Sequence, residues 1–344
     1  MNIDENVVES IVKRVVSQLN TEAASAQTCP SGGDWGVFES MNDAVDAAVE
    51  AQREYLNRSM HDRACYVQAI RDVVLDQENL EYISRLAVEE TGMGGYEYKL
   101  IKNRLAAVKT PGIEDLTTDA MSGDDGLTLV EYSPFGVIGS ITPTTNPTST
   151  TIYKMLLALK TRNAIILSPH PHAVNCSIAA AKIIRDAAIE AGLPEHVISW
   201  VSVPSLEISD YLMKNVDLIM ATGGSGMVKA AYSSGTPAIG VGPGNCNVVI
   251  DESADLRMAV ESIIHSKTFD NGMICASEQH ITVLASVYDE VKRLLKEARC
   301  YFLKDDEAAK VAEVFFNSKT HGVKPGAVGQ TANRLAEMAG IDVP

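Results

Sequence analysis

Between residues 136 and 251, short apolar runs alternate with longer segments of helical periodicity, and this alternation constrains the fold more than any other feature. The apolar runs have the length of buried strands. Strands that are separated by helices of this length lie parallel in one sheet, which helices cover on both faces. The region therefore predicts a doubly wound α/β domain. The predicted strands are GVIGSIT (136–142), NAIILS (163–168), HVISWVS (196–202) and VDLIMAT (216–222).

The carboxyl ends of these strands are the expected place for a ligand. In a doubly wound sheet, ligands bind in the crevice outside the carboxyl ends of the strands. We therefore expect the loops after Ile141, Leu167 and Ala221 to converge on one site.

The flanking segments predict further elements. Residues 37–115 have helical periodicity, and Gly92 has the position of a helix C-terminal cap. The turn-rich SGDDG at 122–126 precedes a strand in the stretch 127–134. A second βα series begins at NVVID (247–251) and resumes at HITVLAS (280–286). We expect a cofactor-binding domain over 35–245 and a second α/β lobe over 246–344.

Charge and cysteine usage exclude several functional classes. The net charge of -16 argues against nucleic-acid binding, which needs a clustered basic surface. The six cysteines are scattered, without the spacing of a zinc site, so we expect no metal and a reducing cytoplasmic setting. No apolar run is long enough to span a bilayer, and no secretory signal begins the chain, so no membrane association is expected.

The segment FDNGMICASEQ at 269–279 is the densest chemical signal. Asp270, Asn271 and Gly272 form a tight loop ahead of Cys275, and we expect a helix to begin just after it. A thiolate at a helix N-terminus is stabilised by the helix dipole and is a good nucleophile. Composition alone favours a small buried hydrophobic role for Cys275, as for most free cysteines, but the surrounding pattern favours the nucleophile.

This segment resembles the catalytic-cysteine motif of the aldehyde dehydrogenase superfamily, in particular its CoA-acylating branch. The resemblance covers most of residues 35–344. It includes SPFGVIGSITPTTNPTST (133–150), KTRNAIILSPHP (160–171), ATGGSGMV (221–228) and VGPGNCNVVID (241–251). Several ordered motifs at matching separations are more specific than any single pattern. The resemblance implies Cys275 as the nucleophile that attacks an aldehyde.

Asn146 is the second predicted catalytic residue. It lies just beyond a strand's carboxyl end, where its amide can donate to a developing alkoxide while the Cys275 N–H supplies a second donor. Asn before Pro147 is also a common turn residue, and without the cysteine motif that alternative is favoured.

The loops that follow the strands predict a dinucleotide site. Gly223 and Gly224 let the backbone approach a pyrophosphate, and a helix that begins near Ser225 directs free N–H groups toward it, although glycine pairs occur in many loops. The predicted cofactor contacts are Thr142, Pro143, Thr144, Ser168, Pro169, His170, Pro171, Thr222, Gly223, Gly224, Ser225, Gly242, Pro243 and Gly244.

The choice between NAD and NADP stays open at this stage, with NAD as the expected cofactor. Hydrolytic members of the superfamily hold the adenosine ribose with a lysine and a glutamate, and here Ser168 and Pro171 take those places. His170 and His172 flank the proline without further metal ligands, so we expect them to line the loop wall.

The absence of a glutamate at position 240 indicates the acyl acceptor. Hydrolytic members carry a glutamate that activates water against the thioacyl enzyme, and here Gly240 takes its place. The thiol of CoA needs less deprotonation than water, so acyl transfer to CoA stays possible. The predicted reaction converts a short aldehyde such as acetaldehyde or propionaldehyde, with CoA and NAD, into acyl-CoA. The alternatives are a hydrolytic enzyme that releases free acid, and an inactive chain that acts only by docking.

The N-terminal segment predicts a docking element. Residues 1–19 form one amphipathic stripe, and residues 20–34 read as a flexible linker. Such a tethered stripe resembles the targeting extensions of enzymes in bacterial microcompartments, so a shell protein is an expected partner through residues 3–19. Alternatively, the helix folds back on its own domain.

The resemblance also implies an incomplete second lobe. The family continues past the equivalent of Pro344, and we expect the missing part to complete the catalytic lobe and to supply a hairpin that pairs with the strand at 127–134 of a neighbouring subunit. The complete enzyme is expected to be a homo-oligomer.

Overall fold

A six-stranded parallel sheet forms the centre of the chain, of which the computed structural model describes residues 37–38, 41–319 and 322–343. Its strands are β1 (Val37–Phe38), β4 (Val137–Ile141), β5 (Ala164–Ser168), β6 (Ile198–Val201), β7 (Leu218–Thr222) and β8 (Ala238–Val241). Their order is β1-β6-β5-β4-β7-β8, and every pairing is parallel. The prediction of a doubly wound α/β fold is confirmed.

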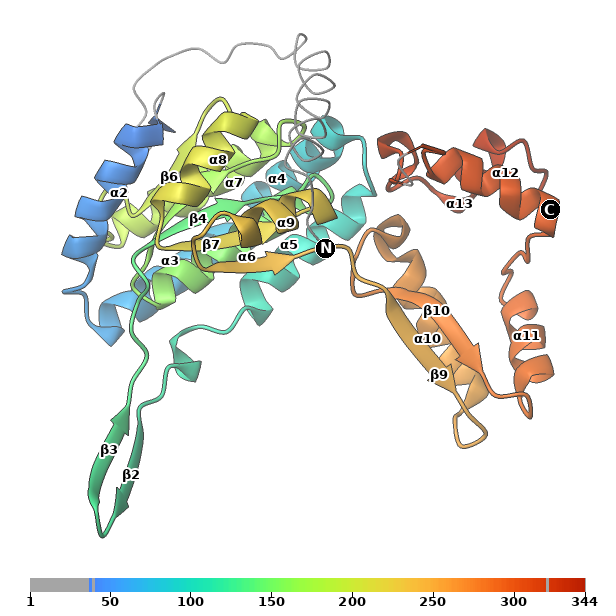
Figure 1. The fold of residues 1–344 in the computed structure, drawn as a ribbon, viewed down its shortest axis with the longest axis horizontal. Coiled ribbons are helices and arrows are strands. Elements are labelled where there is room, and N and C mark those ends of the chain that lie inside the picture. Colours follow the sequence, from blue (N-terminus) through green and yellow to red (C-terminus); the bar gives the residue numbers. More distant parts are fainter. Residues whose placement is uncertain (1–36, 39–40, 320–321, 344) are drawn as a thin grey trace, which may run out of the picture.

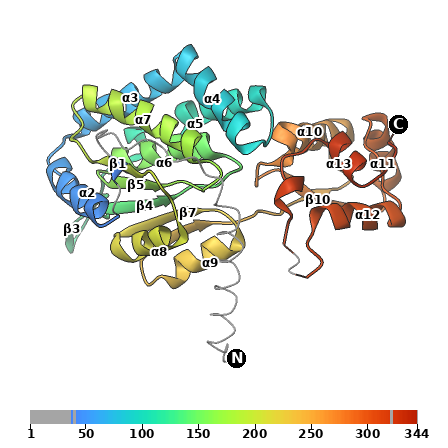
Figure 2. The same cartoon turned by 90° about the horizontal axis from the view of Figure 1, so that it is seen from above.

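Helices cover both faces of this sheet (Figure 2). One layer contains α3 (Met60–Leu75), α4 (Gln77–Thr91), α5 (Tyr96–Lys109), α6 (Pro147–Lys160) and α7 (Val174–Glu190). The opposite layer contains α2 (Met41–Tyr55), α8 (Leu206–Asn215) and α9 (Ser225–Ser233). Because both faces are covered, every residue of β4, β5 and β6 is buried. Gly92 ends α4 in the left-handed conformation, with φ of 64°, as predicted for a C-terminal cap.

A second lobe follows the large sheet (Figure 1). Its strands β9 (Cys246–Ile250) and β10 (Glu278–Val283) pair in parallel, as the second βα series predicted. Its hydrophobic cluster is separate from the core of the large sheet and consists of Ile250, Val260, Ile263, Val291 and Leu294. The helices of this lobe are α10 (Leu256–Thr268), α11 (Tyr288–Glu297), α12 (Asp305–Phe315) and α13 (Ala332–Met338). The lobe also contains the 3-10 turns η3 (Phe269–Gly272) and η4 (Pro325–Ala327), whereas η2 (Ile113–Asp115) lies earlier in the chain, between α5 and β2 (Asp119–Gly123).

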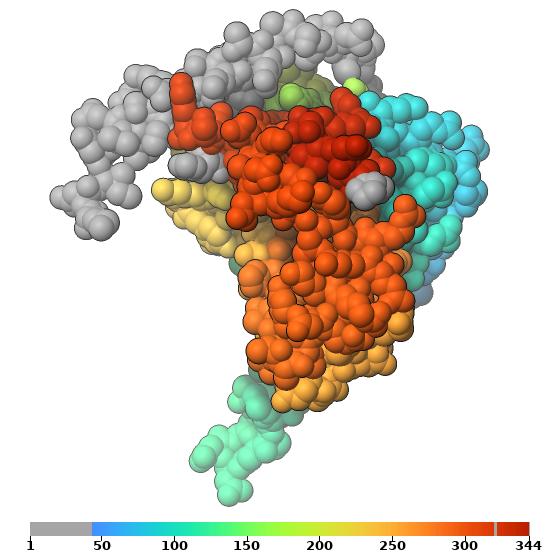
Figure 3. All heavy atoms as spheres, turned by 90° about the vertical axis from the view of Figure 1, so that its right-hand side faces the viewer, coloured from blue at the N-terminus to red at the C-terminus, as the bar shows by residue number. Residues whose placement is uncertain are grey.

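A β-hairpin projects away from both lobes (Figure 3). Strands β2 (Asp119–Gly123) and β3 (Gly126–Val130) pair antiparallel across the turn at Asp124 and Asp125. The predicted strand of 127–134 thus begins one residue earlier and ends at Val130. Its partner β2 is in the same chain, which the sequence analysis did not predict.

The predicted docking helix at 1–19 and the linker at 20–34 lie outside the described residues. Across the residues that are described, no helix is both long enough and apolar enough to cross a membrane.

Candidate active site

The three predicted loops do converge, because β4 lies between β5 and β7. Ile141 at the end of β4 is in register with Ser168 on one side and Ala221 on the other. Lys154 of α6 reinforces this junction, since its Nζ donates to the carbonyls of Ile141 (2.8 Å) and Met220 (2.7 Å). Burial lowers the pKa of Lys154 to about 7. The carboxyl ends of β4 and β7 are therefore tied together behind the site.

Some predicted cofactor contacts are buried and others are partly exposed. Thr142 and Pro143 are buried directly after β4, whereas Thr144 and Asn146 are partly exposed. Ser168 is also buried, and its hydroxyl lies 3.2 Å from that of Ser209. The side chains most accessible to a ligand in the β4 loop are thus those nearest to α6.

The segment after β5 contains His170 and His172, whose ring centroids lie 5.5 Å apart. His170 is half-buried, and Pro171 and His172 are exposed. Burial, and secondarily His172, lower the pKa of His170 to about 4, so this ring is neutral at neutral pH. Among the described residues, no group of three or more His, Cys, Asp or Glu side chains is placed to hold a metal ion.

The predicted helix after the glycine pair begins where expected. Strand β7 ends at Thr222, and Gly224 is the N-cap of α9, which begins at Ser225. No side chain caps this end, and a Cβ at Gly224 would meet open space. The first N–H groups of α9 therefore face a space that suits an anion such as a pyrophosphate.

Cys275 is exposed and lies in a turn that leads into β10. The prediction that a helix begins just after Cys275 is wrong, because Glu278–Val283 forms β10 and pairs with β9 instead. The glycine-rich loop ahead of the lobe lies against this turn. A Cβ added at Gly244 would overlap the Cys275 carbonyl oxygen, so only glycine allows this approach.

The backbone ahead of Cys275 adopts an unusual conformation. Asp270 and Asn271 have φ of 48° and 55°, and Gly272 follows with φ of 72°. Asp, Asn and Gly are the residue types that tolerate this left-handed region best. The Asn271 amide donates to the Gly329 carbonyl at 2.8 Å, which holds the loop in place.

A buried ionic cluster, which the sequence analysis missed, connects this loop to Asn146. Asp270 has no exposed surface, and its carboxylate pairs with Lys99 (3.3 Å) and with Lys102 of α5. It also accepts from the Gly95 N–H at 2.9 Å. Lys102 donates to Oδ1 of Asn146 as well. Burial first, and then Lys99, lower the pKa of Lys102 to about 8, while Asp270 opposes this shift.

Helix α5 buries two lysines and exposes two large apolar side chains, the reverse of the usual amphipathic arrangement. Lys99 and Lys102 are only 1% and 5% exposed, whereas Ile101 and Leu105 are 51% and 53% exposed. Three-residue spacing places the two lysines on one face, so a pattern was present in the sequence. Because lysines normally face solvent, that pattern alone predicts a solvated face.

Gly240 lies in β8, next to α9. A Cβ there would lie 2.8 Å from both Tyr232 Cε2 and Val228 Cγ1. The Gly240 N–H donates to the Tyr232 hydroxyl at 3.0 Å. A glutamate at this position would have to displace the packing of α9 on β8.

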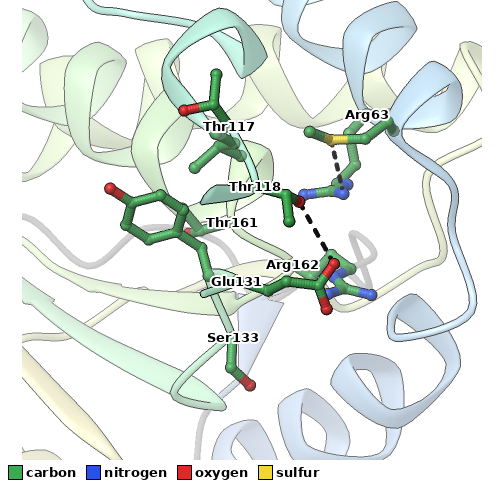
Figure 4. A pocket seen from close by; sticks show the side chains of 10 residues that line it. Arg63, Thr117, Thr118, Glu131, Ser133, Thr161 and Arg162 are labelled. Atoms are coloured by element: carbon green, nitrogen blue, oxygen red, sulfur yellow. Dashed lines mark hydrogen bonds between the residues drawn. The ribbon is translucent and has the colours of Figure 1, made fainter. Parts of the chain in front are cut away.

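A separate pocket lies at the base of the hairpin and away from these loops (Figure 4). Thr161 and Arg162 line it, and they precede β5, which places the pocket at the amino end of the sheet. Arg63 and Glu131 also line it. None of the predicted catalytic or cofactor residues contributes to this pocket.

Comparison with known proteins gives one consistent relationship. The model of the aldehyde dehydrogenase family matches residues 36–311. An aldehyde-alcohol dehydrogenase of Clostridium acetobutylicum is 46% identical over 88% of this chain, which spans only 35% of that relative's length. An acetaldehyde dehydrogenase (acetylating) of Bilophila wadsworthia is 36% identical, with 99% of this chain and 72% of the relative covered.

Solved structures agree with these relatives. The propionaldehyde dehydrogenase of Rhodopseudomonas palustris with bound propionyl-CoA is 46% identical, with a TM-score of 0.84 over 92% of this chain and 72% of that chain. A propionaldehyde dehydrogenase from the fucose utilisation microcompartment of Clostridium phytofermentans is 42% identical, with a TM-score of 0.84 over 90% and 71% of the two chains.

Proposed function

The chain belongs to the aldehyde dehydrogenase family, and from this premise we propose that it is a CoA-acylating aldehyde dehydrogenase. The proposed reaction converts a short-chain aldehyde, CoA and NAD+ into an acyl-CoA and NADH, with NADP+ as the alternative oxidant. The observation that carries the choice of CoA over water is Gly240. Gly240 supplies no general base, and a side chain there would crowd Tyr232 and Val228. Gly244, in the loop that follows β8, approaches the exposed Cys275.

The proposed chemistry begins at Cys275. Its thiolate forms a bond to the aldehyde carbon, and the carbonyl electron pair moves to the oxygen. The Asn146 amide and the Cys275 N–H donate to this oxyanion and stabilise it. When bound, NAD+ supplies the oxidation by accepting a hydride. Cys275 then carries a thioester. Attack by the CoA thiolate breaks the bond between that acyl carbon and Cys275 and returns the electron pair to its sulfur.

The residues around the end of β7 fit a dinucleotide. Gly223 and Gly224 keep side chains away from the N-terminus of α9, whose free N–H groups suit a pyrophosphate. The loops that hold Thr144 and His170 follow β4 and β5 at the same edge of the sheet and would complete the cofactor site.

The test is NADH formation by the 344-residue chain from acetaldehyde and propionaldehyde, with CoA present and omitted. We expect NADH and acyl-CoA only with CoA, and no turnover after Cys275→Ala. Free acid formed without CoA, as identified by mass spectrometry, would replace this proposal by the hydrolytic one. Turnover retained by Cys275→Ala would remove the nucleophile assignment.

Residues 3–19 are proposed to dock on a microcompartment shell protein. The amphipathic stripe of this segment, and the microcompartment source of one structural relative, support the proposal. Deleting residues 1–19 is expected to abolish co-sedimentation with assembled shells and to leave the melting temperature of the enzyme unchanged. Undiminished co-sedimentation, or a lowered melting temperature, would favour a helix that packs on its own domain.

A further inference from the structure

The side-chain amide of Asn146 must present its Nδ2 hydrogens, rather than its oxygen, to an oxyanion. Rotation of an amide by 180° exchanges a donor for an acceptor at nearly the same place, and an acceptor would repel the developing charge. We infer that Lys102 is a positioning residue that selects the productive orientation of Asn146. This inference rests on the proposed function.

The contacts of Asn146 define that orientation. Lys102 Nζ can only donate while it is charged, so it attracts Oδ1 and excludes the Nδ2 edge from its own side. Asn146 Nδ2 donates one hydrogen to Thr145 Oγ1, with 3.2 Å between the nitrogen and the oxygen. The other has no acceptor within the described part of the chain. That hydrogen is thus available to a substrate oxygen.

Asp270 holds Lys102 charged in a buried site. An isolated ammonium would lose its proton there, because burial penalises the charged form. The carboxylate of Asp270 offsets this penalty, and it is itself fixed by the Gly95 N–H. Since Asp270 belongs to the left-handed loop that leads to Cys275, one carboxylate connects the loop of the nucleophile to the predicted oxyanion donor.

Removal of Lys102 leaves the cluster electrically balanced. Lys99 also pairs with Asp270, and it is anchored by donation to the Thr145 carbonyl at 2.8 Å. Lys102→Met therefore leaves one lysine facing one carboxylate, rather than an unpaired buried charge. The variant removes the contact with Asn146 and is expected to fold.

The experiment uses a reaction that forms the oxyanion without any cofactor. p-Nitrophenyl acetate transfers its acetyl group to the Cys275 thiolate and releases p-nitrophenolate, which is measured by absorbance. Mass spectrometry of the intact chain counts the acetyl groups, and Cys275→Ala identifies their site. The compared chains are the unchanged protein, Lys102→Met, Asn146→Ala, the double variant, and Lys109→Met as a control at an exposed lysine of the same helix.

We expect Lys102→Met to slow acetylation roughly tenfold to a hundredfold, because a misplaced oxyanion donor loses most of its effect. Lys109→Met should equal the unchanged chain. Because Lys102 acts through Asn146, adding Lys102→Met to Asn146→Ala should cause no further loss. A Lys102→Met rate within twofold of the unchanged chain, or losses that multiply in the double variant, would overturn this inference alone.

Two further outcomes are distinguishable. No acetylation of Cys275 in the unchanged chain would overturn the proposed function, and this inference with it. If Lys102→Met lacks a cooperative thermal transition, Lys102→Arg carries the test, because it keeps a charged donor that should retain more of the rate than Asn146→Ala does. A Lys102→Arg rate no higher than that of Asn146→Ala would overturn the inference.

The pH dependence separates positioning from simple packing. Above pH of about 8, where Lys102 loses its proton, the neutral amine can accept as well as donate and no longer selects one amide edge. The ratio of the unchanged rate to the Lys102→Met rate should therefore fall between pH 7 and 9. A side chain that only fills space would leave this ratio constant, and that result would overturn the inference.

Discussion

Gly240 is the single residue on which the proposed choice of CoA over water depends. Because a Cβ there would crowd Tyr232 and Val228, Gly240→Glu should lower the melting temperature and should not produce CoA-independent acid release. Thermal unfolding and mass spectrometry of the product measure both effects. Asp or Glu substitution at the open Gly224 provides a comparison for stability, since no neighbour lies within 4 Å of its Cβ. A folded Gly240→Glu variant that hydrolyses aldehyde without CoA would contradict this expectation.

Lys154 is expected to make the free energy of unfolding depend on pH. Its pKa falls from 10.5 to about 7 on folding, so between these values the unfolded chain binds a proton that the folded chain does not. The free energy of unfolding from this group therefore rises with pH across that interval. Lys154→Met should remove this contribution. In urea unfolding from pH 6.5 to 9, the difference between the unchanged chain and Lys154→Met should grow with pH, and parallel curves would contradict the assignment.

The hairpin of β2 and β3 is exposed along its whole length. Isolated two-stranded hairpins are marginally stable in water, and Leu127 and Leu129 on β3 are both exposed. We expect this surface to mediate the predicted homo-oligomer. Leu129→Lys should shift the chain toward monomer in size-exclusion chromatography with light scattering, whereas Thr128→Lys on the opposite hairpin face should not. An equal effect of both variants would argue against this face.

At the scale of the whole molecule, the two separate hydrophobic clusters predict two units of local stability. Leu294→Ala removes a buried side chain from the second cluster and should cost that lobe about 2–5 kcal/mol. Hydrogen exchange should then accelerate in β9, β10 and α10 while β4 and β5 keep their protection. Equal acceleration in the large sheet would show that the chain unfolds as one unit.

Local patterns in the sequence were sufficient to predict the large sheet, and they also gave the proposed site residues. Apolar runs of strand length, separated by helices, predicted β4 to β7 within a few residues, because both periodicities follow from backbone geometry. Gly92 as a helix cap and Ser225 as a helix start were predicted from residue type, because glycine tolerates the left-handed cap conformation and often precedes or ends a helix. The cysteine segment and the motifs around it predicted the family, which the match over residues 36–311 confirms, and proposed Cys275 as the nucleophile.

Tertiary structure decided which faces point inward and which residues meet. Helical periodicity over residues 37–115 includes Lys102. Periodicity shows which residues share a face of the helix, but not whether that face points to the core or to solvent. Only packing shows that Lys99 and Lys102 are buried against Asp270. Likewise, pairing with β9 made the residues after Cys275 a strand, although their local preference suggested a helix. Burial and pairing depend on contacts between distant segments, and local sequence does not contain that information.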